Sequence, residues 1–140
     1  MRILLLALGL VLAGCATAPK NDTQNTTNIS GKTLAAGECG LYVWTADAEK
    51  IFTLFAAAHE VSYLEDGKTV ALTEENPTIP PASSRKFIDP EGKSLTLTLL
   101  APQEINGGTR YKAGRLTSVS EDGWEKVVPI VGLYACQPLV

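Results

Sequence analysis

The feature that most constrains the fold is the alternation of short apolar runs with turn-forming residues from position 38 onward. In residues 94–99, Ser and Thr alternate with Leu95, Leu97 and Leu99, so one face of a strand carries all three leucines. Turn signals recur about every eight to twelve residues, and no run has the length of a convincing long helix. The pattern predicts an all-β domain, a small antiparallel sandwich or barrel of about eight strands.

The expected strands are residues 40–45, 50–58, 61–64, 69–73, 85–88, 94–100, 110–119 and 124–136. Residues 50–58 could form a strand or a short helix, and their β-branched and aromatic content favours a strand. Residues 74–84 contain three prolines, which cannot donate to a sheet ladder, so we expect no central strand there.

The first fifteen residues contain a cationic start at Arg2, an apolar run over 3–13, and Leu12-Ala13-Gly14-Cys15. The run is shorter than the roughly 20 apolar residues of a membrane span. The segment resembles the signal peptide and lipobox of bacterial lipoproteins. The resemblance implies removal of residues 1–14 and lipid attachment, including palmitate, at Cys15. Ala16 then implies an outer-membrane address facing the periplasm. An ordinary cleaved signal with a chance cysteine is the alternative.

With Cys15 assigned to a lipid, Cys39 and Cys136 remain as an even pair in an oxidising compartment. We expect one disulfide that ties the first strand of the domain to the last. A bridge closing so long a loop is assigned about 5 kcal/mol by the chain-entropy model. Two buried free thiols are the alternative.

Residues 16–37 are dominated by Thr, Asn, Ser and Ala, and such a segment offers little apolar surface to offset its ordering entropy. The predicted organisation is therefore a signal peptide at 1–14, a lipidated cysteine and disordered tether at 15–37, and a β domain at 38–140. The net charge of −3 does not provide the basic surface that nucleic acids require, so we expect no nucleic-acid partner.

Residue types that carry catalysis or bind metals are sparse. His59 is the only histidine, so a catalytic triad would have to include it, and a zinc site would lack its usual set of ligands. The paired carboxylates at 65–66, 74–75 and 121–122 fit solvated turns better than a calcium loop. We expect no metal, no cofactor and no catalytic residues.

Two aromatic side chains are candidates for a recognition surface. Tyr42 and Trp44 share one face of the first expected strand, whereas Leu41 and Val43 share the other. The aromatic face is either the core or a binding surface. The same two alternatives apply to Trp124, which lies beside a turn: it either packs against the domain or forms a surface for a ligand.

The lipobox, the cysteine pair and Gly107-Gly108-Thr109-Arg110-Tyr111 together resemble the membrane-bound lysozyme inhibitors. Those proteins are periplasmic lipoproteins with a small β-barrel and a Ser-Gly-x-x-Tyr motif. The resemblance implies inhibitory roles for Gly108 and Tyr111, although Gly107 stands where the family has Ser. The leading hypothesis remains a non-catalytic module that binds an envelope protein or glycan. A lysozyme inhibitor is the alternative, and a minor envelope enzyme is the third.

Overall fold

The computed structural model describes residues 32–77 and 83–139, and these residues form nine antiparallel strands. The strands are β1 (Cys39–Thr45), β2 (Phe52–Ala57), β3 (Glu60–Glu65), β4 (Lys68–Ala71), β5 (Thr73–Glu75), β6 (Ser84–Ile88), β7 (Ser94–Ile105), β8 (Gly108–Val119) and β9 (Glu125–Cys136). No helix occurs among the described residues, so the all-β prediction is confirmed. The uncertain segment at 50–58 contains β2, as its composition favours.

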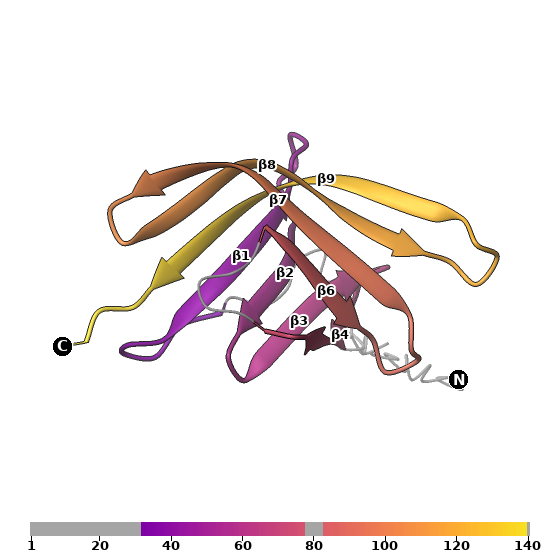
Figure 1. Cartoon of the computed structure of the whole chain (residues 1–140), viewed down its shortest axis with the longest axis horizontal. Coiled ribbons are helices and arrows are strands. Elements are labelled where there is room, and N and C mark those ends of the chain that lie inside the picture. The colour runs from indigo at the N-terminus through magenta and orange to yellow at the C-terminus, as the bar shows by residue number, and fades with distance from the viewer. Residues whose placement is uncertain (1–31, 78–82, 140) are drawn as a thin grey trace, which may run out of the picture.

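The strands follow one another around a nearly closed, barrel-like sheet. Their order is β4-β3-β2-β1-β9-β8-β7-β6-β5, so the first and last strands of the chain are neighbours. The two ends of this order, β4 and β5, are separated in the chain by Leu72 alone, and the Leu72 amide donates to the Val61 carbonyl at 2.9 Å. A single bent segment therefore joins both ends of the sheet. In Figure 1 the long strands β7, β8 and β9 arch over β1 to β4 and β6.

The interior of the barrel is filled by aliphatic side chains and the Phe87 ring. Leu95, Leu97 and Leu99 are all buried, as their alternation predicts. The rest of the core cluster consists of Leu41, Val43, Leu54, Ala56, Leu72, Phe87, Leu116 and Ile130. Fully burying one leucine-sized side chain contributes roughly 1.5–3 kcal/mol, so this cluster is the main source of stability.

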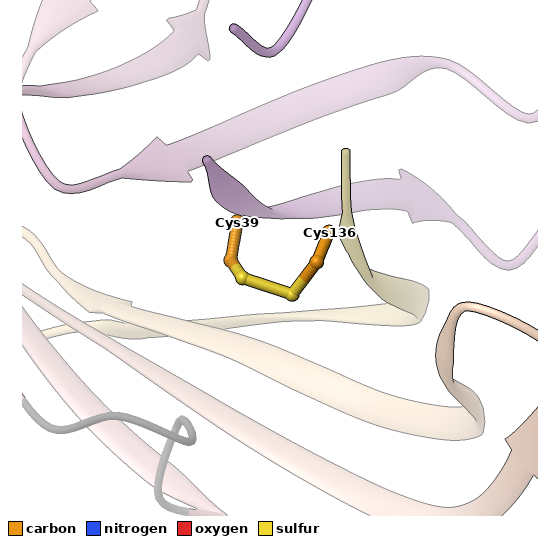
Figure 2. The surroundings of a disulfide bond; sticks show 2 residues. All are labelled: Cys39 and Cys136. Atoms are coloured by element: carbon orange, nitrogen blue, oxygen red, sulfur yellow. A yellow bond between two sulfur atoms is a disulfide. The ribbon is translucent and has the colours of Figure 1, made fainter. Parts of the chain in front are cut away.

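The seam between β1 and β9 is closed covalently. Cys39 and Cys136 lie opposite each other at the end of the β1–β9 ladder, with Cα atoms 4.0 Å apart and an S–S bond of 2.03 Å. Figure 2 shows the bridge between the start of β1 and the end of β9. The two residues are 97 positions apart in sequence, and the predicted disulfide is confirmed.

Strand β7 is longer than the sequence predicts, because it continues through Pro102 to Ile105. Ala101 adopts a φ of 51°, which kinks the strand just before the proline. Strand β6 pairs with β7 only as far as Thr98, so Pro102 lies where β7 has only β8 as its partner. A proline is tolerated there because no ladder donor is needed on the open side.

Two other segments differ from the expectations. Thr73–Glu75 forms β5 and Ser84 begins β6, so the predicted irregular stretch at 74–84 is partly strand, while residues 78–82 lie outside the described part. Residues 32–37, the end of the predicted tether, lie against the barrel. The Lys32 ammonium pairs with the Glu60 carboxylate, and the Gly37 amide donates to the Gln137 carbonyl at 2.9 Å. Cys15 and the rest of residues 1–31 lie outside the described residues.

Candidate binding groove on the outer face of the barrel

The aromatic face of β1 is on the outside of the barrel. Leu41 and Val43 are fully buried in the core, so strand alternation directs Tyr42 and Trp44 outward. This settles the choice between core and surface for that face. Trp124 also lies outside, with 78% of its surface exposed in the turn between β8 and β9.

Tyr42 and Trp44 belong to a group of four rings on β1 and β2 that we call the outer aromatic cluster. Tyr42 lies 6.1 Å from Trp44, 5.8 Å from Phe52 and 5.1 Å from Phe55, and Trp44 lies 5.5 Å from Phe52 (ring centroids). Phe52 and Phe55 are three positions apart and would face opposite ways in a regular strand. A bulge in the β1–β2 register, between Val43 and Trp44, lets both rings contact Tyr42.

One end of the outer aromatic cluster is covered by the chain itself. Leu34 reaches Gly40 beside the Phe55 ring, and Phe55 retains only 3% exposure. The Tyr42 hydroxyl donates to the Lys32 carbonyl at 3.4 Å. Burial raises the pKa of the Tyr42 phenol, and the Glu38 carboxylate raises it further. Trp44 stands at the other end of the cluster, half-buried.

Beside Trp44 the outer surface is hollowed into an open groove of about 600 Å³, which we call the outer groove. Apolar side chains and three cations line it: Trp44, Ile105, Tyr111, Val131, Leu133, Lys50, Arg110 and Lys112, together with Gly132. A volume of this size falls within the range typical of small-molecule sites.

Strand register explains why these residues meet. Trp44 pairs with Val131 across β1 and β9, and Leu133 pairs with Arg110 across β9 and β8, so outward side chains of three adjacent strands form a row. Arg110 and Lys112 reach the groove together with the residue between them. Arg110 and Lys112 share a parity on β8, so alternation directs both to one face, and Tyr111 between them also packs against the core.

The charges of the outer groove oppose the net charge of the chain. Lys50, Arg110 and Lys112 line the groove, and no carboxylate does, although the whole chain carries −3. None of these three cations forms an ion pair with a carboxylate in the described part of the chain. The groove therefore combines an aromatic and aliphatic floor with local positive charge.

The opposite charge gathers at a second cavity of about 510 Å³, at another part of the barrel. Its lining includes five carboxylates and two lysines: Glu65, Asp66, Asp89, Glu121, Asp122, Lys93 and Lys126. A hydrogen bond to Glu91, and the nearby carboxylates, raise the pKa of the exposed Lys93 ammonium. Within residues 32–77 and 83–139, no group of three or more His, Cys, Asp or Glu residues is placed to hold a metal ion.

The carboxylates at 74–75, predicted to be solvated, divide between two environments. Glu75 is exposed, whereas Glu74 accepts two hydrogen bonds from Arg85, at 2.6 Å from Nε and 2.5 Å from Nη2. Both side chains of this pair are only 9% exposed, and the Arg85 guanidinium lies 5.5 Å from the centre of the Phe87 ring. The prediction is wrong for Glu74, because strand pairing between β5 and β6 brings it to an inward-facing arginine.

The remaining candidate residues have different surroundings. His59 is exposed in the turn between β2 and β3, and Cys39 and Cys136 are consumed by the disulfide. Gly108 begins β8 close against the backbone of β9: a Cβ there would lie 1.9 Å from the Tyr134 carbonyl oxygen. Packing therefore explains this glycine. Tyr111 packs against the core and also lines the outer groove, and burial raises the pKa of its phenol.

The structure thus brings Trp44 and Tyr111 into one groove, with Tyr42 beside it and Gly108 outside its lining. Sequence reasoning missed the other lining residues, among them Lys50, Lys112 and Val131. The cysteine pair carried a signal for Val131, because it marks which residues of β1 and β9 are opposite, whereas Lys50 and Lys112 lie on neither strand.

No protein-family model, curated protein or solved structure matches this chain. In the described part of the chain, no helix is long and apolar enough to span a membrane.

Proposed function

We propose that this chain is a lipid-anchored envelope protein whose barrel is a non-catalytic binding module, with the outer groove as its binding surface. The groove carries the proposal. It combines an aromatic platform with three cations on the outer face of the barrel, where aromatic side chains are not needed to fill the core. Concave, mostly apolar surfaces with a few convergent polar groups are the usual form of ligand sites.

Two further observations support the envelope address. Residues 1–15 resemble a lipoprotein signal with its lipobox, and Cys39 and Cys136 form a disulfide, as exported proteins commonly do. Two or more acyl chains on Cys15 would hold the protein firmly at a membrane. A Cys15→Ala variant should accumulate as an uncut precursor without lipid. Palmitate labelling that persists in this variant would exclude the anchor.

The binding surface can be tested in the envelope by photo-crosslinking. A photoreactive residue at Val131, inside the outer groove, should give a discrete adduct. The same residue at Lys68, exposed on β4, serves as the matched control. Adducts of equal yield from both positions, or from neither, would exclude the groove as a specific binding surface.

A second candidate function is inhibition of lysozyme. Tyr111 of the Gly-x-x-Tyr segment lies in the outer groove, and the disulfide joins the first and last strands of a barrel-like sheet. A titration of lysozyme activity with the oxidised protein tests it. Loss of activity near one-to-one stoichiometry, relieved by Tyr111→Ala, supports inhibition. Full activity at large excess excludes it.

A further inference from the structure

The shape of the outer groove selects among ligands. It lies across β1, β9 and β8 and is open to solvent on one side. An acyl chain in an open groove would keep part of its apolar surface in water, which loses much of the hydrophobic gain. A sugar ring has one apolar face and a polar rim, so it can cover an aromatic floor while its hydroxyl groups stay hydrated.

Trp44 is well suited to be that floor because its ring is held in place. It stacks on Tyr42 with an interplanar angle of 15° and contacts Phe52 at 5.5 Å between centroids. A side chain that is already ordered loses little conformational entropy on binding. Val131 and Leu133 extend the apolar floor along β9.

The cations of the outer groove indicate which charged group the ligand carries in addition to its sugar ring. Lys50, Arg110 and Lys112 line the groove with no carboxylate among the lining residues, and they lie on a chain of net negative charge. A guanidinium binds a carboxylate through two parallel hydrogen bonds, and ammonium groups add charge without directional demand. The complementary ligand is therefore a glycan that carries carboxylates.

We propose that the outer groove binds peptidoglycan, with a sugar ring on Trp44 and stem-peptide carboxylates on Arg110, Lys112 and Lys50. This inference rests on the proposed function, because the envelope address is what places this glycan within reach. Peptidoglycan is a polymer of amino sugars with short peptides that bear free carboxylates, so it supplies both parts in one molecule.

The test uses the full mature chain, oxidised and solubilised in mild detergent, and a soluble disaccharide-tetrapeptide fragment of peptidoglycan. Trp124→Phe leaves Trp44 as the only tryptophan, so its fluorescence reports binding directly. We expect saturable binding that weakens as salt is raised, because the carboxylate contacts are partly exposed and therefore screened.

Variants assign the binding to the groove. By calorimetry, Trp44→Ala should weaken binding at least about tenfold, as expected for a central aromatic residue. Arg110→Gln and Lys112→Gln should each weaken it about three- to tenfold, as expected for partly exposed charged hydrogen bonds. Lys68→Gln, the matched charge control on β4, should bind like the wild type. If Trp44→Ala does not fold, the two exposed cation variants decide the test.

Each contrary result has a distinct meaning. If the fragment does not bind at about 1 mM while Val131 still gives its crosslink, the ligand is wrong and the binding module stands. If both fail, the proposed function falls as well. Equal binding of a neutral chitin oligosaccharide refutes the role of the cations. Binding to phosphatidylglycerol vesicles that depends on Arg110, without fragment binding, assigns the groove to a membrane and overturns the inference.

Discussion

Glu74→Gln should destabilise the barrel strongly while preserving the shape of the side chain. The wild-type carboxylate accepts two hydrogen bonds from Arg85, and both side chains are 9% exposed. The amide removes the negative charge and leaves the guanidinium buried against Phe87 without a counter-ion. Removing one partner of a buried ion pair costs about 3–5 kcal/mol, since the remaining charge stays desolvated.

This cost can be measured by urea unfolding. With a slope of about 1.5 kcal/mol per molar urea, the midpoint should fall by roughly 2–3 M. Glu75→Gln is the matched control, because Glu75 is on the same short strand and its exposed carboxylate lies 4.0 Å from the Lys86 ammonium. An exposed pair is screened by water, so the control should lose less than about 1 kcal/mol.

Replacing the whole pair with apolar side chains separates the cost of an unpaired charge from the loss of packing. Glu74→Leu combined with Arg85→Met should be within about 2 kcal/mol of the wild type, because replacing a buried pair with apolar side chains removes both desolvation penalties. Two results would refute the reasoning. One is a Glu74→Gln loss no larger than that of Glu75→Gln, and the other is a double variant as unstable as the single one.

Three further predictions concern the scaffold. Reducing the Cys39–Cys136 bridge should lower the free energy of unfolding by up to about 5 kcal/mol, and an unchanged melting temperature with and without reductant would contradict this. Gly108→Ala should lower the free energy of unfolding, measured with urea, by about 1–3 kcal/mol, because the new Cβ would lie 1.9 Å from the Tyr134 carbonyl oxygen. An unfolding midpoint equal to that of the wild type would refute the close approach. Burial, and then the Glu65 and Asp66 carboxylates, raise the pKa of the Tyr63 phenol above its ordinary 10.0. The protonated phenol therefore stabilises the fold fully below pH 10, and this stabilisation is lost as the pH rises through the pKa of the folded state. Between pH 9 and 11, the free energy of unfolding should fall less for Tyr63→Phe than for the wild type.

Local pattern was enough to predict the elements of this fold that depend on one strand at a time. Leu95, Leu97 and Leu99 are buried as their alternation requires, because a strand directs alternate side chains to one face. Alternation does not say which face is the interior. In β1 both faces are apolar, one aliphatic and one aromatic, and hydrophobicity alone cannot choose between them. The paired strands decide: Val43 lies opposite Gly132, which leaves room for core side chains, while Trp44 lies opposite Val131 on the outside.

The outer groove needed information that alternation lacks, and the disulfide contained part of it. Cys39 and Cys136 face each other directly, so counting five residues inward along each strand pairs Trp44 with Val131. A cross-strand reading of the cysteine pair would thus have predicted the floor of the groove from sequence. The count fails on β8, because the register shift between Tyr111 and Arg115 breaks the ladder with β9. Two of the three groove cations lie outside that count: Lys50 is in the turn between β1 and β2, and Lys112 lies at the shift itself. A bulge of this kind leaves no dependable signal in a single sequence.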